Sequence, residues 1–126
     1  MNYVLAVKSP NYGAQGAFLA FQLAQALLKK GHQIRQIFFF QHGVSNGNAF
    51  ALPANDEFNL LKAWQALAAQ AQIPLHLCVA ASQRRGVVNA QTAQDGAQAN
   101  LAEGFVMAGL GEFIVATLKA DRLLTL

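Results

Sequence analysis

The sequence predicts a single α/β domain over residues 1–126, a three-layer sandwich with a mostly parallel sheet of about five strands and helices on both faces. Two observations predict this class. Short apolar runs rich in strand formers alternate along the chain with segments whose apolar residues recur every three or four positions. The 126 residues are enough for one hydrophobic core but few for two, and no repeat or linker divides them.

The first third of the chain predicts a strand, a helix and a second strand. Residues 3–7 (YVLAV) form an apolar run that ends in the turn residues SPNYG. Residues 15–30 have helical periodicity, and Gly31 is placed to stop that helix. Residues 33–40 (QIRQIFFF) read as the second strand, and a loop over residues 41–55 follows.

A second helix and a third strand fill the middle of the chain. Asn55 or Asp56 can cap the helix, because both residue types accept hydrogen bonds from free amides in a first turn. Pro74 then leads into a strand over residues 75–80 (LHLCVA). The helix is expected to bury a stripe of five side chains: Phe58, Leu61, Trp64, Leu67 and Ala71.

The last third of the chain predicts two more strands around a helix. Residues 105–109 (FVMAG) read as a strand, residues 109–121 as the last helix and residues 122–126 (RLLTL) as the final strand. Residues 91–104 are small and polar, and the pattern does not place them. Alternating strands and helices favour a parallel sheet that is covered on both faces.

The composition restricts the classes of partner. Hydrophobic residues make up 54% of the chain and charged residues only 12%, so part of the surface is expected to be buried against other proteins. A stable but sparsely charged monomer is the alternative. The net charge of +3 comes from scattered residues, which does not favour direct binding of nucleic acid.

The sequence predicts a cytoplasmic protein without a membrane segment. Its first residues lack the features of a signal peptide, and its most apolar late segment is too short to span a bilayer. The single cysteine excludes an intrachain disulfide. Three histidines and one cysteine match no metal-site spacing, and the loop SPNYGAQG lacks the glycine patterns of nucleotide loops. We therefore expect no metal and no cofactor.

Cys78 is the candidate reactive residue. In open parallel sheets, ligands and reactive groups gather beyond the carboxyl ends of the strands, and Cys78 lies near the end of the third predicted strand. Free cysteines are also among the most buried residues, so packing in the core is the competing interpretation. A reactive role requires the thiolate, which positive neighbours or free backbone amides stabilise.

Three residues near Cys78 are candidates for supporting roles. Arg84 and Arg85 follow it by six and seven residues and could stabilise a thiolate if their loop folds back; otherwise they form a solvated loop tip. His76 shares a strand face with Cys78 and could accept a proton or add positive charge, although the sequence favours a half-buried structural histidine. His42 opens the second loop and is a weaker candidate for contact with a partner.

The chain resembles the DsrE/DsrF-like sulfur-relay family, most closely its branch of sulfurtransferase subunits. The resemblance runs from end to end through SPNYGAQGAFLAFQLAQALL, FFFQHGVSNGNAFALPANDEF, CVAASQRRGVV, GFVMAGLGEF and ADRLLTL. It implies a flavodoxin-like fold and a hetero-oligomer with two related sister subunits. The family's reactive cysteine maps onto Cys78, which favours the reactive interpretation over core packing.

The resemblance also implies a reaction. Cys78 would accept a sulfane sulfur as a persulfide from an upstream donor protein and pass it to a cysteine of a downstream acceptor, as in 2-thiouridine synthesis at the wobble position of transfer RNA. Three alternatives remain: a structural subunit beside a sister chain that holds the working thiol, a relay protein of dissimilatory sulfur oxidation, and a flavodoxin-like binder of a small ligand.

Overall fold

The computed structural model describes all 126 residues and contains one sheet of five parallel strands. The strands are β1 (Asn2–Val7), β2 (Gln33–Phe39), β3 (Leu75–Cys78), β4 (Phe105–Ala108) and β5 (Arg122–Thr125). Their order across the sheet is β4-β3-β2-β1-β5, with β2 at the centre and β4 and β5 at the edges. The α/β class and the sheet of about five strands are therefore confirmed, and every pairing is parallel.

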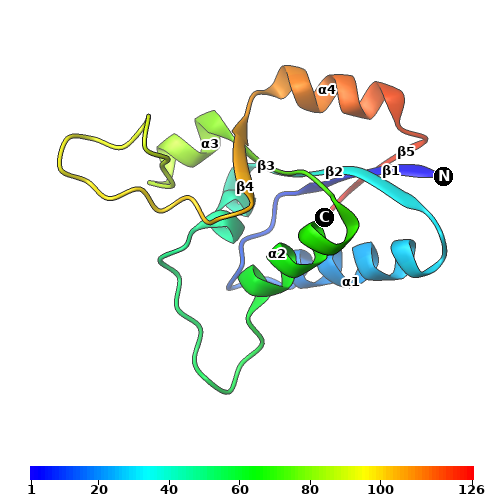
Figure 1. Ribbon diagram of the computed structural model, residues 1–126, viewed down its shortest axis with the longest axis horizontal. Helices are drawn as coiled ribbons and strands as arrows, with labels where there is room; N and C mark the ends of the chain where they lie inside the picture. Colours follow the sequence, from blue (N-terminus) through cyan, green and yellow to red (C-terminus); the bar gives the residue numbers. More distant parts are fainter.

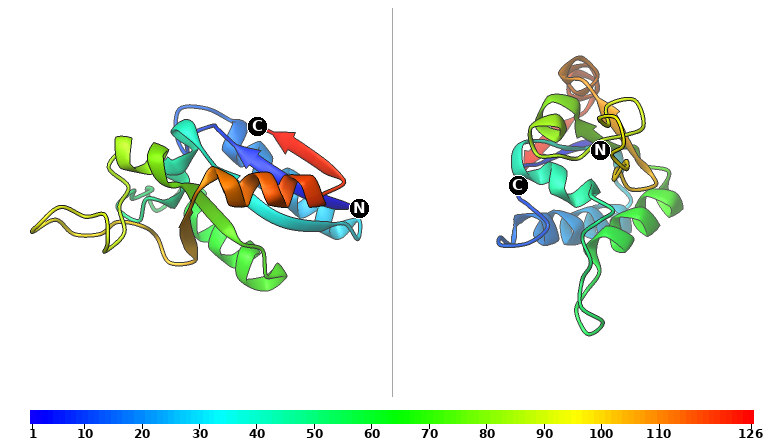
Figure 2. Two further views of the ribbon diagram at one scale, coloured as in Figure 1. Left: turned by 90° about the horizontal axis from the view of Figure 1, so that it is seen from above. Right: turned by 90° about the vertical axis from the view of Figure 1, so that its left-hand side faces the viewer.

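Helices cover both faces of the sheet (Figures 1 and 2). Two of them, α1 (Gly16–Lys29) and α2 (Leu60–Ala71), lie together on one face, and α4 (Leu110–Lys119) lies on the other. A short helix, α3 (Val79–Arg84), and a 3₁₀ helix, η1 (Gln41–Gly47), lie beyond the carboxyl ends of the strands. This is the three-layer arrangement that the alternating pattern predicts.

The hydrophobic core lies between the sheet and the α1/α2 face. Leu5, Ile37, Leu75 and Leu77 extend from the strands toward buried residues of the helices, among which Trp64 of α2 is fully buried. Four consecutive residues of β1 are buried because both faces of this central strand are covered. Five residues of α1 complete the packing: Ala17, Ala20, Phe21, Ala24 and Leu27.

The second helix differs from the prediction. It begins at Leu60, and Asn59 caps it by accepting a hydrogen bond from the Lys62 amide at 3.0 Å, so a start at Asn55 or Asp56 is wrong. Of the expected buried stripe, Trp64 is fully buried, and Leu61 and Leu67 are half-buried against the core. The prediction is wrong for Phe58, which precedes the helix and is 54% exposed, and for Ala71, which is exposed at the end of the helix. Residues 48–59 instead form an extended loop that projects from the body of the molecule (Figure 1).

The third strand is shorter than predicted. In addition, a short helix stands at the start of the segment after β2 and another at the start of the segment after β3, where the sequence predicts loops. Strand β3 ends at Cys78 rather than at residue 80, and α3 begins at the next residue. The loop predicted for residues 41–55 starts with η1, in which the backbone of Gly43 lies against β1. A Cβ atom at Gly43 would lie 2.1 Å from the carbonyl oxygen of Val7, so no larger residue fits there. Residues 85–104 return along the outside as a long loop with no helix or strand of its own.

Candidate functional site

Cys78 is the last residue of β3 and the residue immediately before α3. Its backbone, at φ −58° and ψ 120°, makes the turn from strand to helix without a connecting residue. The side chain is partly exposed, and part of it packs against the hydrophobic core. Both earlier interpretations therefore describe part of its environment: Cys78 borders the core, yet it is partly exposed to solvent.

The position beyond the strand ends is the one that parallel sheets use for reactive groups. Cys78 pairs with Ala108 of β4, and Gly109 separates Ala108 from the first residue of α4, so the backbone starts of α3 and α4 are neighbours at this edge of the sheet. The first amides of a helix have no partner within the helix and carry partial positive charge. The Cys78 side chain makes no capping hydrogen bond to the first turn of α3, so the chemistry that this setting permits is that of a partly exposed thiol.

The two arginines lie at the far end of α3 from Cys78. At about 1.5 Å of rise per residue, six or seven residues separate them from it by about 10 Å along the helix. Arg85 donates to the carbonyl oxygen of Ala81 at 3.2 Å and to Nδ1 of His42 at 3.4 Å, whereas Arg84 is exposed and makes no side-chain hydrogen bond. Arg85 thus connects α3 with η1, and neither arginine contacts the sulfur.

His76 lies on the same face of the sheet as Cys78, toward α4. Its side chain is 15% exposed, its Nδ1 makes no hydrogen bond, and Oε2 of Glu112 in α4 lies 3.9 Å from that nitrogen. No hydrogen bond joins His76 to Cys78. The structure therefore brings His76 near Glu112, a residue that the sequence did not single out.

Two buried asparagines that the sequence did not single out hold the loops around this edge. Asn46 donates to the carbonyl oxygens of Ser9 and Gly43 at 3.1 and 2.9 Å and accepts a bond from Nε1 of Trp64 at 3.3 Å. Asn100 accepts from the Val88 amide at 2.8 Å and so fixes the long return loop. Asn46 lies in η1 and Asn100 in the long return loop, and neither segment has a periodic sequence pattern, so no local signal distinguishes them from solvated loop residues.

Tyr12 and Gly13 lie in the first loop, between β1 and α1. The Tyr12 hydroxyl donates to Oε1 of Glu57 at 3.3 Å, and Gly13 has φ +88°. Loss of hydration, the negative charge of Glu57 and this hydrogen bond, in that order, raise the pKa of Tyr12 above its ordinary value of 10.0. Tyr12 is therefore protonated at neutral pH and serves to connect two loops.

The structure contains no group of three or more His, Cys, Asp or Glu side chains that could hold a metal ion. Every helix also falls short of the length and apolar character that crossing a bilayer requires.

Comparison with known proteins agrees with this picture. The chain is 66% identical over 126 residues to "Sulfurtransferase TusD homolog" of Haemophilus influenzae, with all of both chains covered. It is 64% identical to the protein of the same name from Pasteurella multocida, again over the full length of both. It is 48% identical to "Sulfurtransferase TusD" of Pectobacterium carotovorum, with 98% of each chain covered. These relatives belong to the TusD branch, the branch that the sequence most resembles.

A solved structure supports the fold alone. The crystal structure of the ychN protein from E. coli superposes with a TM-score of 0.79 over the full length of both chains, at 22% sequence identity. The family model described as "DsrE/DsrF-like family" matches residues 1–126. From a full-length family match and relatives of the same length, we conclude that the chain belongs to the DsrE/DsrF-like family.

Proposed function

We propose that this chain is a cytoplasmic sulfurtransferase that carries sulfane sulfur on Cys78 within a relay for 2-thiouridine synthesis at the wobble position of transfer RNA. One observation carries the proposal: the only cysteine stands partly exposed at a strand end, in a chain whose full-length relatives bear the name sulfurtransferase. The TusD name of those relatives supports transfer-RNA thiolation over dissimilatory sulfur oxidation.

The proposed reaction is two successive exchanges at sulfur. The Cys78 thiolate attacks the outer sulfur of a donor persulfide, a new S–S bond forms on Cys78, and the donor sulfur leaves as a thiolate. An acceptor thiolate then attacks the outer sulfur on Cys78, and Cys78 leaves as the thiolate. Each step breaks one S–S bond and forms another, so the pair needs no external oxidant or reductant.

The partners of this relay are proteins. We propose TusB-like and TusC-like sister subunits, a TusA-like donor and a TusE-like acceptor, with transfer RNA handled by a later enzyme. The low charge content and the exposed apolar side chains of α4 support burial against sister subunits. The scattered positive charges give no surface for direct binding of RNA.

Mass measurement of the intact subunit tests the carrier role. After incubation of the assembled complex with a persulfide donor protein, we expect this chain to gain the mass of one sulfur atom and to lose it when acceptor is added. Cys78→Ser should abolish the gain and the transfer. Because the chain has no other cysteine, a gain that persists in Cys78→Ser would contradict the proposal. No gain on this chain while a sister chain is loaded would identify a structural subunit.

The same assay tests the supporting residues. If Arg84, Arg85 or His76 promotes the exchange, Arg84→Gln, Arg85→Gln or His76→Gln will slow loading of Cys78. Lys62→Gln is the matched control for the two arginines, because it removes one positive charge from an exposed site on α2. Equal rates in all four variants would leave Cys78 as the carrier without these helpers.

A further inference from the structure

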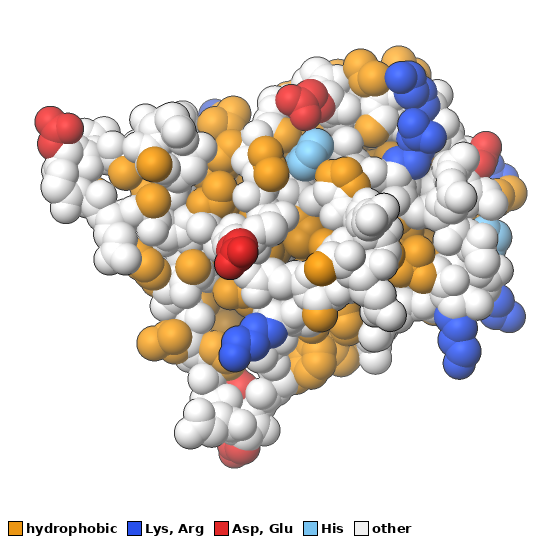
Figure 3. Space-filling model, viewed as in Figure 1, with side chains coloured by type: hydrophobic (Ala, Val, Ile, Leu, Met, Phe, Trp, Pro, Cys, Tyr) orange, Lys and Arg blue, Asp and Glu red, His pale blue; other side chains and the backbone are white.

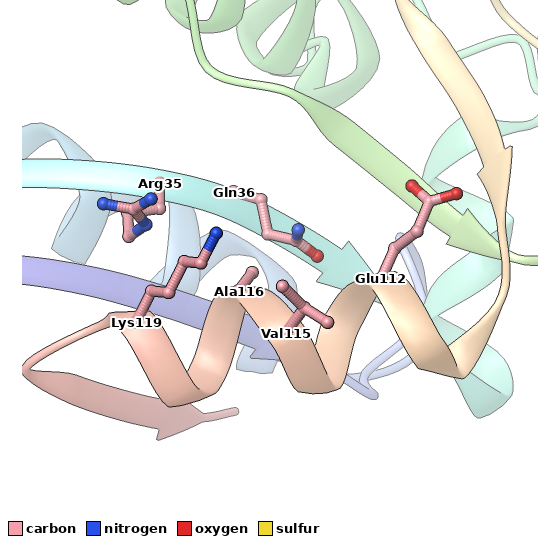
Figure 4. A pocket seen from close by; sticks show the side chains of 6 residues that line it. All are labelled: Arg35, Gln36, Glu112, Val115, Ala116 and Lys119. Carbon is pink, nitrogen blue, oxygen red and sulfur yellow. The ribbon is translucent and has the colours of Figure 1, made fainter.

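A pocket of about 360 Å³ lies between β2 and α4, away from the strand ends. Its lining is mixed, with four polar or charged side chains and two small apolar ones: Arg35, Gln36, Glu112, Val115, Ala116 and Lys119. Figure 4 shows Arg35 and Lys119 at one end, Glu112 at the other end and Gln36 between them. This volume is within the range of pockets that hold small ligands.

A β-bulge builds one wall of this pocket. The pairing of β1 with β2 shifts between Tyr3, which pairs with Ile34, and Val4, which pairs with Gln36, so Arg35 is an extra residue. In a regular strand, neighbouring side chains point to opposite faces, but Arg35 and Gln36 both line the α4 side. Bulges of this kind redirect side chains and are frequent next to functional sites.

Three of the four polar side chains of the pocket, Arg35, Gln36 and Lys119, lack side-chain partners within the chain. Gln36 is only 6% exposed, and its buried Oε1 accepts no hydrogen bond. Neither Arg35 nor Lys119 lies within ion-pair distance of a carboxylate, since the only such contact in the chain joins His76 and Glu112. A buried amide oxygen without a partner costs free energy and is rare in native structures, which indicates that a hydrogen-bond donor from outside the chain satisfies it.

We propose that this pocket binds a carboxylate. Arg35 and Lys119 supply two positive charges, and the guanidinium of arginine matches the two oxygens of a carboxylate. The Gln36 amide lies beside them and can donate through its nitrogen. Val115 and Ala116 offer apolar contact to an aliphatic chain that leads away from the carboxylate.

The opposite end of the pocket selects the rest of the ligand. Glu112 lies seven residues before Lys119 on α4, about 10 Å along the helix axis. Its negative charge disfavours a second anionic group and favours a hydrogen-bond donor such as an ammonium or hydroxyl group. Oε1 of Gln36 accepts from the same kind of group. The preferred ligand is therefore a single carboxylate with a donor at its far end, rather than a dicarboxylate.

Two sources can supply this carboxylate: a free organic acid, or an aspartate or glutamate side chain of a protein partner. Val115 is 51% exposed and Leu118 is 80% exposed beside the pocket, so both a small molecule and a protein surface can reach it. In both cases Arg35 and Lys119 bind a carboxylate. The site does not depend on the sulfur of Cys78, so its failure and the failure of the proposed relay are separable.

Titration of the ¹⁵N-labelled full chain with 6-aminohexanoate, monitored by NMR, tests the site. We expect saturable shifts of the Gln36 side-chain amide and weaker binding of hexanoate, which lacks the donor end. Hexylamine, which lacks the carboxylate, should not bind. Arg35→Gln and Lys119→Gln should each weaken binding about tenfold, the usual effect of losing one charge-assisted hydrogen bond. Lys62→Gln and Cys78→Ser should leave binding unchanged.

Carbodiimide coupling in the assembled complex distinguishes the two sources. This reagent joins an amine to a carboxylate in direct contact, so a Lys119 cross-link to an acidic residue of a sister subunit identifies a protein carboxylate. Binding of 6-aminohexanoate with no Lys119 cross-link identifies a free acid. The proposal is overturned if neither binding nor cross-link occurs, or if hexylamine binds as well as 6-aminohexanoate.

Discussion

The two faces of the sheet are covered unequally. On one face, α1 and α2 supply six buried side chains to the core, with Trp64 fully enclosed. On the other face, α4 supplies none, and four of its apolar side chains are more than half exposed: Leu110, Ile114, Val115 and Leu118. Figure 3 shows hydrophobic side chains at the surface along α4, at the top of the view.

This difference assigns a different role to each face: one stabilises the fold of the single chain, and the other is available for binding to other proteins. The α1/α2 face buries enough apolar surface to hold the fold within one chain. The α4 side is held mainly by Phe113, which stacks on Phe38 with ring centroids 4.5 Å apart. An apolar helix face that its own chain leaves exposed is typical of a surface that another protein covers. Three substitutions test the comparison, in order of expected effect.

The largest loss of stability is expected for Trp64→Ala. The side chain is fully buried, contacts the rings of Phe21 and Phe39 edge-on, and donates a hydrogen bond to Asn46. The cavity and the unpaired amide oxygen should lower the free energy of unfolding by about 3–5 kcal/mol. Urea unfolding measures this change. Trp64→Phe, which keeps much of the volume, should lose clearly less; an equal loss would contradict the packing argument.

A smaller loss is expected for Phe113→Ala. This substitution removes the stack with Phe38, but Phe113 is only half-buried, so we expect about 1–2 kcal/mol. Amide hydrogen exchange should become faster in α4 and stay unchanged in α1. The neighbouring Ile114→Ala is the matched control, since Ile114 is 53% exposed. A loss as large as that of Trp64→Ala would show that both faces stabilise the fold equally.

The smallest effect on the isolated chain is expected for Leu118→Ser. Leu118 is 80% exposed, so the free energy of unfolding should change by less than about 0.5 kcal/mol. Leu27→Ser, which places the same change on the buried face of α1, should destabilise strongly. If α4 is covered in the assembly, Leu118→Ser should weaken binding to sister subunits in sedimentation measurements. A destabilised isolated chain would argue against an exposed role for this helix.

The sequence predicts the fold well where one pattern dominates. Apolar runs and helical spacing predict the five strands and the helices between them along the chain, and they place Cys78 near the end of a strand. The start of α2 was missed because Asn55 and Asp56 resemble a cap. In the structure, Glu57 accepts hydrogen bonds from the Ala54 amide at 2.7 Å and from Tyr12, which stabilise a loop instead.

The surroundings of the candidate site depend on contacts between distant residues. The pairing of Arg85 with His42 joins positions 43 residues apart, and no local pattern indicates it. The bulge at Arg35 likewise arises from how β1 and β2 align, although QIRQIFFF reads as one uninterrupted strand. Local periodicity was thus enough to place the cysteine near a strand end. The residues around it, and the pocket between β2 and α4, could be identified only from the folded structure.

The direct passage from β3 into α3 has a mechanical consequence for sulfur transfer. Because no loop residue separates β3 from α3, Cys78 is held in place and cannot move between distant partners as a residue on a flexible arm does. If it carries sulfur, each visiting cysteine must travel to this fixed point on a mobile segment of its own protein. Donor and acceptor proteins would then compete for the same binding site at Cys78 and occupy it one after the other. An excess of donor should therefore slow the transfer of sulfur from Cys78 to the acceptor.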